Sequence, residues 1–241
     1  LSVGRQPMTA ALPWPAGVIL DLDGTLVDTL PDIAAAAQWA CVQLSLPVPS
    51  VAQIGLWVGE GVELLVKRFL TGEMAGQPPP ALLQQGLTLF GQRYAIQVCV
   101  ASQVFPGVIA GLDWLAHHGI PLAVVTNKSE VFTLALLRKL ALESRFPIIL
   151  SGDSLPKRKP DPAPLHEAVR RLGLAATAPV LVVGDSRSDI RAARAAGMPV
   201  VAMAYGYNHG RDIREENPDA VLERLDALPA LLPPPPPRTR A

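Results

Sequence analysis

Short aliphatic runs that end in polar residues recur along the chain. They are "GVILDLD" (17–23), "IPLAVVTN" (120–127), "FPIILSGD" (146–153), "VLVVGDS" (180–186) and "PVVAMAYG" (199–206). Continuous runs of this kind, without alternation, predict strands that are covered on both faces, as in a parallel sheet. Amphipathic stretches follow three of them: "SEVFTLALLRKLAL" (129–142), "DPAPLHEAVRRLGL" (161–174) and "RSDIRAARAAGM" (187–198). This alternation predicts an α/β fold with a doubly wound, mostly parallel, Rossmann-like sheet.

The interval after the first strand is too long for an ordinary crossover. The first strand ends near Asp23 and the next begins near Ile120, while the span between them has helical character. A plain crossover uses one helix, so we expect a helical cap at 29–102. The α/β core then comprises 16–28 and 103–228. We expect residues 1–15 to be a flexible lead and 229–241 to be a proline-rich tail, because "LLPPPPPRTRA" favours an extended conformation.

Composition narrows the possible partners and the compartment. The chain has 241 residues, with 21 Lys plus Arg and 21 Asp plus Glu. This balance gives no long-range field that would attract nucleic acid or an anionic membrane. No run approaches the ~20 apolar residues that span a bilayer. Cys41 and Cys99 lack metal-ligand spacing, which favours thiols in a reducing compartment. We therefore expect a cytoplasmic protein, either a monomer or a homodimer, without membrane or nucleic-acid partners.

Polar residues collect where the predicted strands end. In open α/β sheets, ligands bind outside the carboxyl ends of the strands. The residues expected to meet there include Asp21, Asp23, Thr126, Asn127, Lys128, Lys159, Asp185 and Asp189. Lys157 is an alternative to Lys159, and Asp189 is either a helix-start carboxylate or a support for the site.

This set of residues suits phosphoryl transfer. Carboxylate oxygens are the hard ligands that Mg²⁺ prefers, and Asp21, Asp23 and Asp185 can supply them. Asp21 could attack phosphorus and form an aspartyl phosphate, while Asp23, two positions along an extended chain, faces the same way and acts as acid and base. Thr126, Asn127 and Lys159 would bind the small phosphorylated substrate.

Four motifs, in this order, resemble those of the haloacid dehalogenase superfamily: "DLDGTLVDT" (21–29), "VVTN" (124–127), "KP" (159–160) and "GDSRSD" (184–189). The resemblance implies that Asp21 is the nucleophile and that Asp23 is the acid/base, with its backbone carbonyl on Mg²⁺. It also implies that Thr126 binds phosphate, Lys159 orients nucleophile and phosphate, Asp185 ligates the metal and Asp189 supports the site. The helical insert resembles the cap of that superfamily, which closes over the substrate.

Three further stretches resemble bacterial phosphoglycolate phosphatases of the superfamily. They are "LWVGEGVELLVKRFL" (56–70), "LVVGDSRSDIRAARAAGMP" (181–199) and "YGYNHG" (205–210). This resemblance implies hydrolysis of 2-phosphoglycolate to glycolate and phosphate. The alternatives are a phosphatase for another small ester, a phosphomutase and, more remotely, a catalytically silent binding protein on the same fold. The segment Gly59–Gly61 either links two cap helices or descends over the site.

Overall fold

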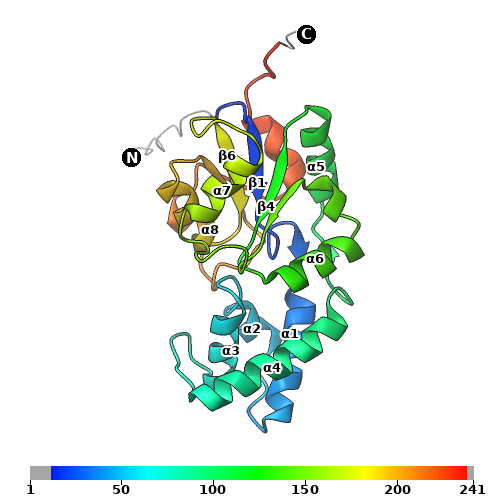
Figure 1. Ribbon diagram of the computed structural model, residues 1–241, viewed down its shortest axis with the longest axis vertical. Helices are drawn as coiled ribbons and strands as arrows, with labels where there is room; N and C mark the ends of the chain where they lie inside the picture. Colours follow the sequence, from blue (N-terminus) through cyan, green and yellow to red (C-terminus); the bar gives the residue numbers. More distant parts are fainter. Residues whose placement is uncertain (1–11, 238–241) are drawn as a thin grey trace, which may run out of the picture.

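The computed structural model describes residues 12–237 and contains a six-stranded parallel sheet with strand order β5-β4-β1-β6-β7-β8 (Figure 1). The strands are β1 (Gly17–Leu20), β4 (Leu122–Val125), β5 (Ile148–Leu150), β6 (Val180–Gly184), β7 (Val200–Met203) and β8 (Ala220–Leu222). The predicted doubly wound sheet is confirmed. Five strands match the aliphatic runs, and β8 is an additional edge strand that the pattern did not predict.

Helices cover both faces of the sheet (Figure 1). One face is covered by α5 (Val108–His117), α6 (Glu130–Lys139) and the 3₁₀ helix η3 (Leu225–Leu231), and the other by α7 (Ala163–Arg171) and α8 (Arg187–Ala195). Successive side chains of a strand point to opposite faces. Accordingly, Val18 and Leu20 pack in the core beneath α5 and α6, whereas Ile19 packs beneath α7 and α8. Two further 3₁₀ helices, η1 (Glu143–Arg145) and η2 (Ile213–Glu216), lie in connections.

Four helices lie beyond the carboxyl ends of the strands, at the bottom of Figure 1. They are α1 (Leu30–Gln43), α2 (Val51–Gly55), α3 (Val62–Thr71) and α4 (Pro80–Gln97), and α4 packs against both α1 and α3. They fall in the span where we expected the cap. We call α1–α4 with their connecting loops the cap helices. The proposed boundaries between core and cap stay a prediction.

The chain enters and leaves the cap helices through two adjacent segments. The short strands β2 (Val27–Asp28) and β3 (Gln103–Val104) pair antiparallel there. The buried carboxylate of Asp32 accepts hydrogen bonds from the backbone N–H groups of Val100, Ala101 and Ser102, at 2.8–3.1 Å. The start of α1 is thus tied to the returning chain.

Both ends of the described chain differ in part from expectation. The flexible lead predicted for 1–15 is wrong at its inner end, because Leu12 is buried and the Trp14 ring lies 5.8 Å from that of Trp114. The rest of that prediction, 1–11, lies outside the described residues, as does 238–241 of the predicted tail. The tail also begins later than 229, because η3 runs to Leu231 and packs against α5. Within 12–237 no helix is long and apolar enough to cross a membrane.

Candidate active site

Three carboxylates from two strand ends converge at the edge of the sheet that faces the cap helices. Asp21 follows β1, and its backbone N–H donates to the carbonyl of Val183 in the neighbouring β6. Asp185 and Asp189 follow β6. One carboxylate oxygen from each of these three aspartates lies within 4.8 Å of those of the other two. The convergence expected from the strand ends is therefore present.

The carboxylate of Asp185 is fixed on both oxygens. Its Oδ1 accepts from the Thr25 hydroxyl at 2.6 Å, and its Oδ2 accepts from the Tyr207 backbone N–H, also at 2.6 Å. Gly24 and Gly206 pack so closely here that a Cβ at either position would overlap the Asp185 side chain. Gly24 also has a φ of +84°, which glycine adopts readily. Glycine at these two positions lets the turns approach the carboxylate.

Lys159 lies among these carboxylates and is only 4% exposed. Its Nζ donates to the Val125 carbonyl and to Asp189 Oδ1, both at 2.6 Å, and forms an ion pair with Asp21 Oδ1 at 2.9 Å. Lys157, the alternative, is exposed and pairs with Asp161 at the surface. The structure thus brings Lys159, and not Lys157, to the site.

Asp189 makes contacts that fit both of the alternatives that the sequence left open. Its Oδ2 accepts from the hydroxyl and the backbone N–H of Ser186, at 2.7 and 3.0 Å, in a capping box at the start of α8. Its Oδ1 holds Lys159. Because both oxygens are engaged, Asp189 orients the lysine while it caps the helix.

The site has more negative than positive charge. Burial raises the pKa of Asp21 to about 7, although Lys159 partly offsets this effect. Burial, and then the charges of Asp189 and Asp21, also raise the pKa of Asp185. Burial opposes the charge of Lys159, but the carboxylates of Asp189 and Asp21 outweigh it and raise its pKa. Three carboxylates around one ammonium group fit a hard divalent cation, which would compensate the excess charge.

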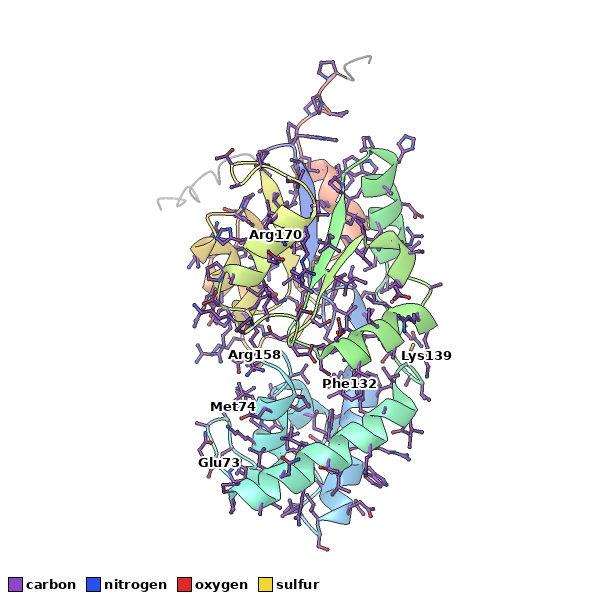
Figure 2. The ribbon with its side chains drawn as sticks, in the orientation of Figure 1. Glu73, Met74, Phe132, Lys139, Arg158 and Arg170 are labelled. Carbon is purple, nitrogen blue, oxygen red and sulfur yellow. The ribbon has the colours of Figure 1, made fainter. Side chains whose placement is uncertain are left out.

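A cavity of about 550 Å³, a volume that includes the solvent space at its mouth, lies between this edge of the sheet and the cap helices. Asp21, Asp23 and Thr126 line its polar end. Its other end is largely apolar and includes Phe132, labelled in Figure 2 at the start of α6 where the core faces α4. The Thr126 hydroxyl accepts from the Lys128 backbone N–H at 3.3 Å and donates to no acceptor within 12–237, which leaves its proton for a ligand.

Asn127 reaches the cavity but uses its amide nitrogen on the backbone. That nitrogen donates to the Lys159 carbonyl at 3.0 Å and to the Gly59 carbonyl at 3.4 Å. Gly59 belongs to the loop between α2 and α3, so this contact joins the core to the cap helices. Substrate binding by Asn127 stays a prediction.

Lys128, which we expected at this edge of the sheet but to which the sequence assigned no role, lies beside Asp23. Its Nζ donates to both carboxylate oxygens of Asp23, at 3.0 and 3.1 Å, and to the Tyr94 hydroxyl at 2.8 Å. The available signal was its position directly after Thr126 and Asn127, at the same strand end. Lys128 thus engages both oxygens of the Asp23 carboxylate, and metal binding by Asp23 stays a prediction.

The loop around Glu60 links α2 and α3 and also descends to the core, while substrate contact by Gly59–Gly61 stays a prediction. The Glu60 carboxylate pairs with Arg68 of α3 and accepts from Arg187 of α8 at 2.8 Å. Burial alone would raise the pKa of Glu60, but hydrogen bonds from the two arginines lower it to about 2. Glu60 therefore stays ionised and forms a bridge between cap and core.

The fold and the site define an α/β protein with a carboxylate–lysine centre at the strand ends, beneath four helices. The chain belongs to the haloacid dehalogenase-like hydrolases, because the sequence model of that family matches residues 18–203. The resemblance expected from the four motifs is confirmed.

Similar proteins cover nearly the whole chain. Phosphoglycolate phosphatases of Thiobacillus denitrificans and Nitrosococcus oceani are 47% and 42% identical to it, over 86% and 92% of this chain and 91% and 98% of theirs. A crystal structure described as a predicted phosphoglycolate phosphatase, from Haemophilus somnus, superposes with a TM-score of 0.84 at 32% identity, covering 90% of this chain and 97% of that one.

Proposed function

We propose that this protein is a magnesium-dependent phosphatase that hydrolyses 2-phosphoglycolate through an aspartyl-phosphate intermediate. The observation that carries the proposal is that Asp21 lines a cavity together with Asp23 and Thr126, while Lys159 Nζ lies 2.9 Å from its Oδ1. The substrate is supported by the relatives that are named phosphoglycolate phosphatases and match this chain at 42–47% identity.

The residues that would hold Mg²⁺ are the carboxylates of Asp21 and Asp185 and the backbone carbonyl of Asp23. The excess negative charge of the site and its oxygen donors fit a hard cation of this kind. When bound, the ion supplies positive charge that offsets the carboxylates and the phosphate. Asp189 supports the arrangement by holding Lys159.

In the first step, a carboxylate oxygen of Asp21 attacks phosphorus. The bond between phosphorus and the ester oxygen breaks as the aspartyl phosphate forms, and Asp23 gives its proton to the departing alkoxide. Lys159 and the Thr126 hydroxyl stabilise the charge that persists on the phosphoryl oxygens.

In the second step, Asp23 takes a proton from a water molecule that attacks the phosphorus of the aspartyl phosphate. The bond between phosphorus and the Asp21 oxygen breaks, so inorganic phosphate leaves and the carboxylate is regenerated. The cap helices, tied to the core through Glu60 and Arg187, exclude bulk water during the reaction.

We further propose that the protein acts in the cytoplasm on small phosphorylated metabolites. The free thiols of Cys41 and Cys99 are consistent with a reducing compartment. A monomer and a homodimer both stay open as predictions.

The test is phosphate release from 2-phosphoglycolate, sugar phosphates, a nucleotide and p-nitrophenyl phosphate, each with Mg²⁺ or with EDTA. We expect Mg²⁺-dependent release with the highest kcat/KM for 2-phosphoglycolate. A higher kcat/KM for another ester would contradict the substrate, and transfer of phosphate within a sugar would favour a phosphomutase. Absence of turnover with every ester would support the silent binding protein.

A further inference from the structure

Lys128 is the one cationic side chain among the residues that line the cavity within 12–237. The other lysine of the site, Lys159, is not among these lining residues; it donates to the Val125 carbonyl and to Asp189 and forms an ion pair with Asp21. The positive charge available to the part of a substrate that lies beyond the phosphate is therefore that of Lys128.

The Lys128 ammonium group is buried, with 9% of the residue exposed, and is held in a defined position. Asp23 holds it from the core side and the Tyr94 hydroxyl from the side of α4. The Tyr94 ring is itself fixed, because it stacks on Phe90 and meets the edge of Phe132, with ring centroids 5.5 and 4.9 Å away. An ammonium group fixed in this way is preorganised to bind an anion.

The Tyr94 hydroxyl offers a second hydrogen-bond donor at the same point. It accepts from Lys128 and donates to no acceptor among residues 12–237, although Tyr94 is 1% exposed. A buried hydroxyl that donates to nothing forgoes a hydrogen bond that a ligand could form. Lys128 and Tyr94 therefore present an ammonium group and a hydroxyl proton to the same small volume.

Apolar side chains, mostly from the cap helices, line the same cavity beside the polar residues Thr126, Asn127 and Ser129: Ile33, Val58, Leu65, Phe90 and Phe132. These apolar side chains offer no hydrogen bonds to a polar leaving group, and an anionic group beside them needs a cation nearby. A hydroxyl group on the leaving alcohol gains much less from Lys128 than a carboxylate does, because charge-assisted hydrogen bonds are the stronger ones.

We propose that Lys128 and Tyr94 bind the carboxylate of the leaving group and thereby select phosphate esters of short hydroxy acids over phosphate esters of neutral alcohols. This inference rests on the proposed function, since it concerns the substrate of the same site. The bound carboxylate accepts from the Tyr94 hydroxyl and takes one of the three N–H groups of Lys128, while Asp23 keeps the others. Lys128 is then a specificity-determining residue in addition to holding Asp23.

The test compares two esters of equal length, 2-phosphoglycolate and 2-hydroxyethyl phosphate, which differ in a carboxylate against a hydroxymethyl group. Hydrogen bonds to a charged group change a binding constant by about 10- to 150-fold. We expect wild-type kcat/KM to favour 2-phosphoglycolate by a factor in this range. Lys128→Met should reduce this preference by about tenfold or more, Lys128→Arg should retain part of it, and Tyr94→Phe should reduce it by a smaller factor. Lys157→Met, which removes an exposed surface lysine, should leave it unchanged.

A purely positioning role for Lys128 predicts a different result. If Lys128 only held Asp23, Lys128→Met would lower kcat/KM for both esters by the same factor, and the unchanged ratio would overturn the proposal. A second measurement needs no variant. Glycolate should inhibit wild-type hydrolysis of p-nitrophenyl phosphate at a concentration about tenfold or more below that of the neutral isostere glycolamide. Equal inhibition by the two would also overturn the proposal.

Different results would contradict the proposed function and the carboxylate site at Lys128. Absence of Mg²⁺-dependent phosphate release from every ester would contradict the proposed function itself. Release from 2-phosphoglycolate and 2-hydroxyethyl phosphate with equal kcat/KM would leave a phosphatase in place and would contradict only the carboxylate site at Lys128.

Discussion

Replacement of Asp21 by asparagine should raise the stability of the metal-free fold and abolish turnover, and so separate the effect of the buried carboxylate on stability from its role as nucleophile. The pKa of Asp21 is raised from 3.8 to about 7. At pH values well above 7, this shift corresponds to roughly 4 kcal/mol by which ionised Asp21 destabilises the metal-free fold. Because the side chain is 13% exposed and asparagine also loses the ion pair with Lys159, we expect about half of this value to be recovered.

The sign of the pH dependence follows from the direction of the shift. A carboxyl group whose pKa is higher in the folded than in the unfolded state binds its proton more tightly when folded. The contribution of protonated Asp21 to wild-type stability is therefore complete below about pH 4 and is lost as the pH rises toward about 7. The Asp21→Asn variant does not show this decrease in stability, because asparagine does not ionise. Lys159 stays compensated in the variant, because Asp189 and the Val125 carbonyl still hold it.

The assay is thermal unfolding in EDTA at about pH 5.5 and about pH 8, with phosphate release measured in parallel. A gain of about 2 kcal/mol in a chain of this length raises Tm by about 4–8 °C. We expect this rise near pH 8, a smaller one near pH 5.5, and turnover reduced to below a few per cent of wild type in the presence of Mg²⁺. Asp113→Asn, which removes an exposed carboxylate, is the matched control and should change Tm little. A lower Tm of Asp21→Asn near pH 8 would refute the electrostatic reasoning, and retained turnover would refute the nucleophile.

Three other variants test separate parts of the account. Asp185→Asn should raise the Mg²⁺ concentration for half-maximal activity by about tenfold or more, and an unchanged metal titration would contradict its assignment as a ligand. Lys159→Met removes the ammonium group between Asp21 and Asp189 and should lower the free energy of unfolding by about 3–5 kcal/mol in urea denaturation, so a loss below about 1 kcal/mol would be inconsistent with the ion pairs described. Glu60→Gln should raise KM about two- to tenfold, because it weakens the bridge between cap and core, and an unaltered KM would show that this bridge does not support substrate binding.

Five of the six strands of the sheet could be predicted, because buried strands require aliphatic residues that are visible in the sequence. Central strands covered on both faces need continuous aliphatic runs, and each of the five runs became a strand. The edge strand β8 has only three apolar residues, Ala220–Leu222, flanked by Asp219 and Glu223, whereas β5 at the other edge lies in the longer run "FPIIL" (146–150). The packing of Leu12 and Trp14 could not be predicted, because single apolar residues next to prolines do not indicate the surface against which they pack.

The convergence of the carboxylates was predictable for a topological reason: carboxyl ends of parallel strands meet at one edge of a sheet. That reasoning brought Asp21, Thr126, Lys159 and Asp185 to one place. It could not predict that Lys128 holds Asp23, because the sequence does not indicate which acceptor each of the neighbouring side chains of Asn127 and Lys128 reaches. The bridges from the loop around Glu60 to the core depend on where the cap helices lie, which no local pattern specifies.

The most direct test of the central claim is identification of the phosphorylated residue. A single turnover of 2-phosphoglycolate with radiolabelled phosphate, quenched in acid at short times and followed by peptide mapping, reports whether the enzyme is phosphorylated. Asp23→Asn, in which the second step is slowed, should accumulate more label than wild type. We predict that the label resides on the peptide that contains Asp21 and is absent from Asp21→Asn. Complete release of phosphate with no label on the protein at any quench time, or label on another residue, would contradict the account.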